Sequence, residues 1–292
     1  MLVGYSDNAI IGADHARFLR QIDAWTCSTK MHAGPASLAR PWSYETVLPP
    51  LKMNATLRAG VLKCLLECTR ELWSHANFVF SEDGLQMRAM DSSHVALASL
   101  ELPPSAFVSF WCPQRTTLGI QLDALSIVLK SCAPNDEIAL SFAVGNDHIT
   151  ILRGEDRQWE LKLLEMEECE LSIPAQSYDV SMSICSSELQ RCLRDLKELG
   201  GDSVAISVNE SRVSFSVDGE VGRGTAVIVQ EAEGVSGLSC SYSLRYVTAF
   251  AKGAPLNPSV RMQYGPDTPI CFTYDVEGDG RLEFHLASRI VE

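Results

Sequence analysis

The sequence lacks several patterns that would assign it to a common class of enzyme or metal protein. None of its 10 cysteines stands in C-x-x-C spacing, and the nearest pair, Cys64 and Cys68, has no accompanying second pair of ligands with metal spacing. A phosphate-binding P-loop and the glycine motif of dinucleotide-binding folds are also missing. We therefore expect reduced, mostly buried thiols, no metal and no cofactor.

Long apolar runs are missing as well. Stretches such as residues 61–66 are broken by charge far short of the roughly 18 residues that cross a bilayer. The N-terminal residues carry an early Asp7 and have no basic start followed by an apolar run, which disfavours a secretory signal. We expect a protein of the cell interior that does not span a membrane.

The sequence also lacks the basic surplus that is usual in proteins that bind nucleic acid. It has 24 Lys and Arg against 37 Asp and Glu, a formal net charge of -13. Because phosphate contacts favour clustered Lys and Arg, the charge must be examined locally. At 46% hydrophobic and 21% charged residues, the 292-residue chain can bury one large or two modest cores.

From Met53 onward the chain reads as a duplication. An amphipathic helix is predicted over 60–73, and its counterpart over 186–201. Short strands with period-two alternation follow each of these helices. A second helix is predicted in each half, over 122–133 and 244–254, and further strands follow it. The periodicity therefore predicts two copies of one α+β domain.

Basic residues gather on the predicted helices. In the 186–201 helix, Ser187 and Gln190 fit a capping box, and Gly200 and Gly201 supply a stop. The four helices carry six acidic residues but eight cations, so they are slightly basic in an acidic chain. Such a face suits phosphate attraction without sequence readout. The candidate DNA-facing cations are Lys63, Arg70, Lys130, Arg191, Arg194, Lys197, Arg245 and Lys252.

An enzymatic function is not indicated. Asp91, Ser92, Ser93 and His94 are adjacent, whereas a hydrolase triad is assembled from separated segments whose side chains converge. We expect no catalysis.

Five separated segments are distinctive, namely MDSSHVAL at 90–97, LSIPAQSY at 171–178, LRDLKELGGD at 193–202, SLRYVTAFAKGAPL at 243–256 and LASRI at 286–290. Together they resemble the proliferating cell nuclear antigen family, the sliding clamps of eukaryotic DNA replication. The resemblance covers 53–292 and implies two DNA-clamp domains, 53–165 and 179–292, joined by a connector over 166–178. Residues 1–52 are left as an N-terminal extension, either flexible or the product of a start site upstream of the true initiator Met53.

This resemblance implies a head-to-tail homotrimer that encircles double-stranded DNA, with helices on the inner face of antiparallel sheets. It also implies a processivity factor for DNA polymerase and a nuclear scaffold for replication, repair and translesion synthesis, loaded by a clamp loader. By alignment, the edges that close the ring are 156–164 and 221–230. The expected subunit-interface residues are Trp159, Leu161, Leu163, Ala226 and Ile228.

The resemblance further implies a pocket for short partner peptides that carry a Gln, an apolar residue and paired aromatic residues on one helical turn. Three departures leave the partner set and regulation open: His285 replaces a common Tyr on the pocket wall, the loop before residue 243 is shorter, and Glu210 replaces the lysine used for ubiquitin-type modification. The alternative is a subunit of a checkpoint-type heterotrimeric clamp or a divergent paralogue. The expected pocket residues are Met90, His94, Val95, Leu97, Leu171, Ile173, Pro174, Pro269, His285 and Ala287.

Overall fold

The computed structural model divides the chain between Val47 and Leu48, and every element that it describes belongs to the second unit. Within these described residues, no helix is long and apolar enough to cross a membrane. The expected extension over 1–52 lies almost wholly outside them, as does most of the expected connector. The residues that the structure describes are 52–166, 176–209, 211–234, 237–266 and 268–289.

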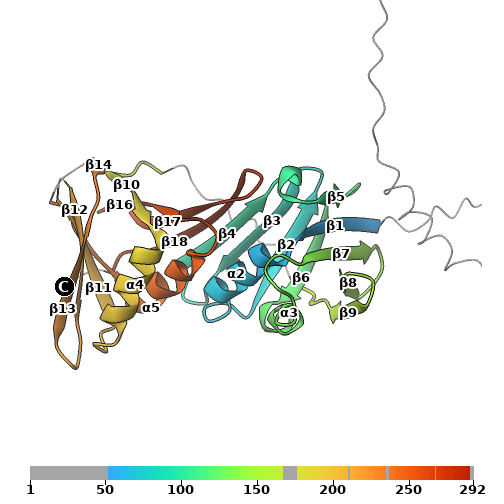
Figure 1. Cartoon of the computed structure of the whole chain (residues 1–292), viewed down its shortest axis with the longest axis horizontal. Coiled ribbons are helices and arrows are strands. Elements are labelled where there is room, and N and C mark those ends of the chain that lie inside the picture. Colours follow the sequence, from blue (N-terminus) through green and yellow to red (C-terminus); the bar gives the residue numbers. More distant parts are fainter. Residues whose placement is uncertain (1–51, 167–175, 210, 235–236, 267, 290–292) are drawn as a thin grey trace, which may run out of the picture. The chain divides into compact units, whose positions relative to one another are not determined.

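The first half of the described chain alternates two helices with groups of short strands (Figure 1). Its elements are β1 (Lys52–Arg58), α2 (Ala59–Thr69), β2 (His75–Ser81), β3 (Gly84–Met90), β4 (Ala96–Leu102), η1 (Pro104–Ala106), β5 (Ser109–Trp111), β6 (Thr116–Gln121), α3 (Leu122–Leu129), β7 (Glu137–Ala143), β8 (His148–Arg153) and β9 (Arg157–Lys162).

The second half repeats this order, which confirms the duplication predicted from periodicity. Its elements are β10 (Val180–Cys185), α4 (Ser186–Lys197), β11 (Ser203–Asn209), β12 (Arg212–Asp218), β13 (Arg223–Val229), β14 (Ala232–Gly234), β15 (Ser239–Ser243), α5 (Leu244–Phe250), η2 (Ala251–Gly253), β16 (Ser259–Gly265), β17 (Thr268–Val276) and β18 (Gly280–Leu286).

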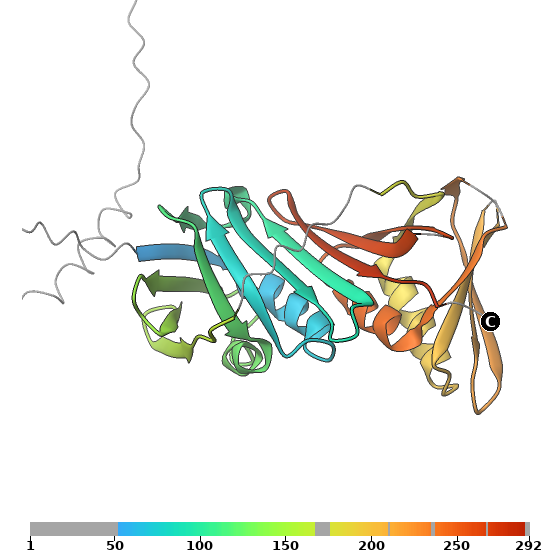
Figure 2. The same cartoon turned by 180° about the vertical axis from the view of Figure 1, so that it is seen from behind.

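The strands form three antiparallel sheets, and the largest sheet crosses the boundary between the two halves. A five-stranded sheet has the order β5-β1-β7-β8-β9, and a four-stranded sheet has the order β13-β12-β11-β15. The nine-stranded sheet, β14-β10-β16-β17-β18-β4-β3-β2-β6, joins the halves where β18 pairs with β4. Figure 2 shows these strands from the face opposite the helices. The fold class predicted from the sequence is confirmed.

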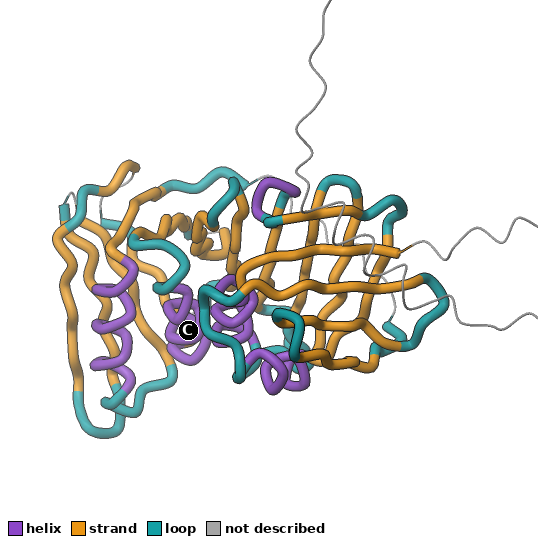
Figure 3. The backbone as a smooth tube through the Cα atoms, turned by 45° about the vertical axis from the view of Figure 1, so that its right-hand side comes forward, coloured by secondary structure: helices purple, strands orange, loops and turns teal. Residues whose placement is uncertain are grey.

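The four helices pack against the sheets through apolar faces and contact one another across the boundary. In α4, Leu189, Leu193 and Leu196 are buried at the three- and four-residue spacing of one helical face. Contacts run from α2 to α3, α5 and η2, and from α4 to α5 and η2. The helices thus form one group beside the strands (Figure 3). The ring of Phe250 stacks on Phe284, with 4.6 Å between centroids.

The four α-helices end earlier than predicted, at Thr69, Leu129, Lys197 and Phe250, and the predicted capping box is also wrong. The first helix ends at Thr69, not at residue 73, and the Thr69 hydroxyl donates to the Leu65 carbonyl 2.8 Å away. Such a local side-chain bond competes with continuation of the helix. The capping box is absent from the described α4, which begins directly after Cys185 with no side-chain cap. The Ser187 hydroxyl lies 3.3 Å from the Cys185 thiol instead.

Candidate ring-closing edges, basic helical face and peptide row

The two segments that alignment places at subunit interfaces form β9 and β13, and each strand ends a sheet. Among the described strands, β9 pairs only with β8, and β13 only with β12. Both therefore present unpaired backbone groups along one side. On β9, Trp159 is half-buried and Leu161 is buried; on β13, Ala226 is half-buried and Ile228 is buried. Each of these two edge strands could therefore pair with a further strand from another chain.

Internal symmetry relates these free edges to the junction already formed inside the chain. The turn between β2 and β3 matches the turn between β11 and β12, so β4 corresponds to β13. Likewise the turn between β17 and β18 matches that between β8 and β9, so β18 corresponds to β9. The pairing of β18 with β4 is thus a template for pairing β9 with β13 of another copy.

This template fixes a register. Inside the chain, Leu282 lies opposite Leu100 and Phe284 lies opposite Ala98. If β9 paired with β13 of another copy in the same register, Trp159 would lie opposite Ala226, and Leu161 opposite Gly224. Each of these two pairs would combine a large side chain with a small one, as close packing of an interface requires.

Sequence reasoning missed two valines on the same edge. Val227 and Val229 alternate with Ala226 and Ile228 on β13 and are 51% and 76% exposed. The sequence contains a pattern that could have identified them: residues 226–229 are all apolar, whereas a strand with one solvent-exposed face would alternate apolar and polar residues. An exposed apolar edge strand of this kind is typical of a surface covered by another chain.

The predicted DNA-facing cations divide into two groups. Five are exposed and make no ion pair within the described part of the chain. The other three are engaged: Lys63 Nζ donates to the Cys132 carbonyl at 2.6 Å, Arg245 Nη2 donates to the Glu71 carbonyl at 2.7 Å, and Lys252 Nζ pairs with Glu71 Oε1 at 2.7 Å. The five exposed cations are Arg70, Lys130, Arg191, Arg194 and Lys197.

Glu71 gathers cations from both halves of the chain. The hydrogen bond from Lys252 is the main cause that lowers the pKa of the Glu71 carboxyl, and the charges of Lys197 and Arg70 add to it. Helices α2, α4 and η2 therefore bring positive charge to one place, although the whole chain is acidic. Local excess of this kind attracts phosphate without base contacts.

Three of the predicted pocket residues lie side by side on the sheet face away from the helices. Met90 on β3 pairs with Leu97 on β4, which pairs with His285 on β18. Cys271 on β17 continues the series beyond His285. We call these four residues the peptide row. Met90 is 36% exposed, so the row is open at that end.

The other described pocket residues flank the row. His94 Nδ1 lies 3.0 Å from Met90 Sδ, and the Ala287 amide donates to the Val95 carbonyl at 2.9 Å. Pro269 is half-buried at the start of β17. Four residues of the predicted pocket and regulatory position fall outside the described residues, namely Leu171, Ile173, Pro174 and Glu210.

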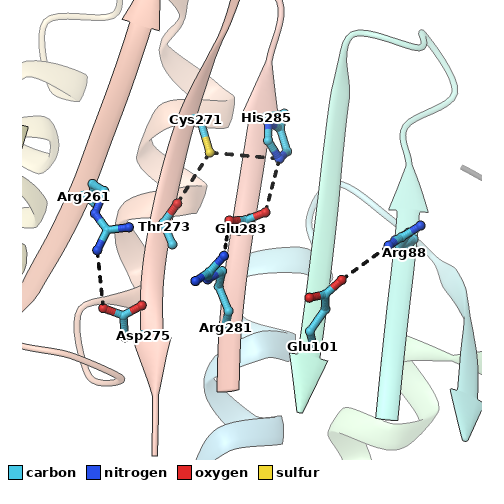
Figure 4. A network of polar contacts seen from close by, with 9 residues as sticks. All are labelled: Arg88, Glu101, Arg261, Cys271, Thr273, Asp275, Arg281, Glu283 and His285. Carbon is cyan, nitrogen blue, oxygen red and sulfur yellow. Dashed lines mark hydrogen bonds and ion pairs between the residues drawn. The ribbon is translucent and has the colours of Figure 1, made fainter. Parts of the chain in front are cut away.

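His285 is buried within a polar network on this face (Figure 4). Its Nε2 lies 3.7 Å from Glu283 Oε2 and 4.0 Å from Cys271 Sγ, while Arg281 reaches Glu283 from the other side at 3.7 Å. Burial lowers the pKa of His285, but the Cys271 thiol and the Glu283 carboxylate outweigh it and raise the pKa to about 9. The peptide row therefore contains a buried cation at neutral pH.

The described residues contain no group of three or more His, Cys, Asp or Glu side chains that could hold a metal ion. Cys64 and Cys68 lie in α2, where burial is the largest cause that raises the pKa of Cys68. Both thiols are buried in the helical layer, in agreement with their expected structural role.

Comparison with known proteins agrees with this geometry. Residues 53–173 match the family described as "Proliferating cell nuclear antigen, N-terminal domain", and residues 172–289 match its C-terminal domain. A solved structure of the proliferating cellular nuclear antigen from Entamoeba histolytica superposes with a TM-score of 0.77 at 26% identity, covering 82% of this chain and 99% of that one.

The fold is thus that of a sliding clamp, a class of non-enzymatic scaffold associated with DNA. The chain belongs to the proliferating cell nuclear antigen family.

Proposed function

We propose that the protein is a replicative sliding clamp, a homotrimeric ring that encircles double-stranded DNA in the nucleus. In this role it acts as the processivity factor of a DNA polymerase. It also serves as a scaffold for the clamp loader and for repair and translesion proteins that carry short clamp-binding peptides. Its two clamp domains span 53–165 and 179–292, with a connector over 166–178. Residues 1–52 are either an N-terminal extension or the product of a start site upstream of Met53.

The observation that carries this proposal is the match between the two free edges and the internal junction. One chain holds both halves of the contact, because β9 and β13 correspond to β18 and β4. Joining the five-stranded and four-stranded sheets of two copies would produce a sheet of nine strands, the same number as in the sheet that crosses the boundary within one chain. A head-to-tail contact of this kind closes into a ring when the rotation permits.

The charge distribution supports DNA as the molecule inside the ring. The five exposed cations lie on α4 or directly after α2 and α3, whereas the acidic surplus lies elsewhere. A few phosphate contacts without groove-edge readers give weak, salt-sensitive and sequence-independent binding. Such contact permits sliding along the duplex.

The alternative is a subunit of a checkpoint-type heterotrimeric clamp or a divergent paralogue. A heteromeric clamp would not require β9 to fit β13 of the same sequence. Here the large residues Trp159 and Leu161 face Ala226 and Gly224 in the register that internal symmetry sets, so self-assembly is favoured.

We predict that replacing Arg191 and Arg194 by alanine lowers polymerase stimulation about three- to tenfold at 150 mM salt, because two phosphate contacts are lost. The measurement is primer extension on closed circular templates with a clamp loader. Arg212→Glu changes the net charge equally on the exposed start of β12 and serves as the control, for which we expect no loss. Equal effects of the two variants, with rings intact, would reject the basic helical face.

A further inference from the structure

A buried carboxylate lies beneath the loop that borders the peptide row. Asp91 is 4% exposed and follows β3 directly. Its Oδ1 accepts hydrogen bonds from the amides of Val95 at 2.8 Å and Ala96 at 2.7 Å, and its Oδ2 accepts one from the amide of Ser93 at 3.1 Å. Three backbone donors of a single short loop, residues 91–96, therefore converge on one side chain.

A fourth donor comes from the other half of the chain. The Tyr246 hydroxyl on α5 donates to Asp91 Oδ2 at 2.8 Å. Buried carboxylates need such donors, since an unsatisfied charge in this position costs several kcal/mol, roughly the scale of burying an ion without its partners. Asp91 Oδ2 thus accepts hydrogen bonds from both the loop, through the Ser93 amide, and α5, through the Tyr246 hydroxyl.

The loop contains two of the predicted pocket residues, His94 and Val95, and its backbone includes an unfavourable conformation. His94 has a φ of 55°, in the left-handed region that non-glycine residues seldom adopt. Val95 is 39% exposed, and its carbonyl accepts the Ala287 amide of the second half. The amides of Val95 and Ala96 both donate to Asp91 Oδ1, so this one oxygen orients two successive peptide groups of the loop.

Tyr246 itself is firmly placed. Its ring lies 6.3 Å from that of Phe250, which stacks on Phe284 of β18. The neighbouring Arg245 donates to the Glu71 carbonyl, which fixes α5 against the end of α2. The hydrogen bond from Tyr246 therefore couples the position of α5, in the second half, to the conformation of the loop 91–96, in the first half.

The protonation states of the pair suit this bond. Burial alone raises the pKa of Asp91, but the amides of Ala96, Val95 and Ser93 and the Tyr246 hydroxyl outweigh it, and the pKa is lowered. Burial, with the charge of Asp91, raises the pKa of Tyr246. At neutral pH the phenol is a donor and the carboxylate an acceptor.

We propose that Asp91 and Tyr246 form a positioning pair for partner peptides, in which α5 of the second half sets the shape of the loop 91–96 through the Asp91 carboxylate. The pair touches no peptide itself; it holds His94 and Val95 beside the peptide row. This inference rests on the proposed function, because it concerns the same peptide site. It makes peptide binding dependent on the junction between the two halves.

The test is Tyr246→Phe, which removes one hydroxyl and keeps the ring. We expect it to weaken binding of a labelled probe peptide with one Gln, one aliphatic residue and two adjacent aromatic residues by about five- to tenfold. This is less than the full contribution of a hydrogen bond to a charged group, because the pair acts on the peptide only through the loop. Amide hydrogen exchange at Val95 and Ala96 should accelerate, while exchange in the strands stays unchanged. Fluorescence anisotropy and exchange mass spectrometry measure the two effects.

Tyr242→Phe is the matched control, since it removes the hydroxyl of another buried tyrosine that makes none of the described hydrogen bonds to Asp91. We expect its affinity to stay within about twofold of wild type, because no bond to the Asp91 carboxylate is lost. In an Asp91→Asn background, Tyr246→Phe should add little further loss. Unchanged affinity or unchanged exchange at Val95 in Tyr246→Phe would overturn the positioning pair alone. Failure of the wild-type protein to bind the probe would instead overturn the peptide site, and the pair with it.

Discussion

Replacing Trp159 by alanine is expected to convert the proposed ring into single chains. In the register that internal symmetry sets, Trp159 of one copy packs against Ala226 of the next. Removing a large aromatic side chain from such a contact costs about 2–3 kcal/mol per junction, or roughly 30- to 150-fold in each association constant. Every copy contributes the same edge, so all junctions weaken together. Light scattering at micromolar and submicromolar concentrations measures the change.

Trp111→Ala is the control for this prediction. Trp111 lies on β5, at the other edge of the same five-stranded sheet, and is 54% exposed. The same atoms are removed, but no partner strand is proposed there, so the assembly should persist. If Trp159→Ala kept the wild-type mass at submicromolar concentration, the proposed pairing of β9 with β13 would be wrong.

The free energy of unfolding is expected to fall by about 2–3 kcal/mol between pH 6.5 and pH 9 because of His285 alone. The pKa of this residue is raised from 6.5 to about 9 in the folded chain. A raised pKa means that the folded state binds the proton more tightly than the unfolded state does. The stabilisation is therefore complete below pH 6.5 and is lost as the pH rises through 9. Denaturant unfolding across this range measures it.

Glu283→Gln should reduce this pH dependence, because it deletes the carboxylate 3.7 Å from His285 Nε2 while keeping the size of the side chain. The Cys271 thiol, the larger cause of the raised pKa, remains. Glu101→Gln is the control on the neighbouring strand β4, where Glu101 pairs with Arg88 at 3.3 Å on the surface. Loss of an exposed pair changes stability by at most about 1 kcal/mol and does not alter the slope above pH 6.5. An unchanged slope in Glu283→Gln would show that Glu283 does not raise the pKa of His285.

Much of the secondary structure could be predicted because the spacing of apolar residues along the chain indicates helices and strands. The helices at 60–73 and 186–201 and the strands after them follow from three-to-four and two-residue spacing. The helix ends could not be predicted as well: α2 ends at Thr69, before the predicted end at residue 73, and α4 begins without the predicted capping box. The pairing of β18 with β4 was beyond reach, since the partners are about 180 residues apart and no local signal specifies non-local pairing.

The candidate sites divide in the same way. The edge strands followed from the family resemblance, and the helical cations from counting charges on predicted faces. The structure adds what spacing cannot show, namely that Glu71 draws in Arg245 and Lys252. Asp91 looked like part of a false catalytic cluster in the sequence, whereas its buried carboxylate holds the loop over 91–96 and bonds to Tyr246. Only the folded chain brings residues so distant together.

The central claim is that one sequence supplies both edges of a closed ring. Light scattering of the purified full chain, without other proteins or DNA, tests it most directly. The account predicts a mass three times the 32.0 kDa of one chain, unchanged on dilution to the submicromolar range. A stable single chain that assembles only when other subunits are added would contradict the homotrimer and favour the heterotrimeric clamp.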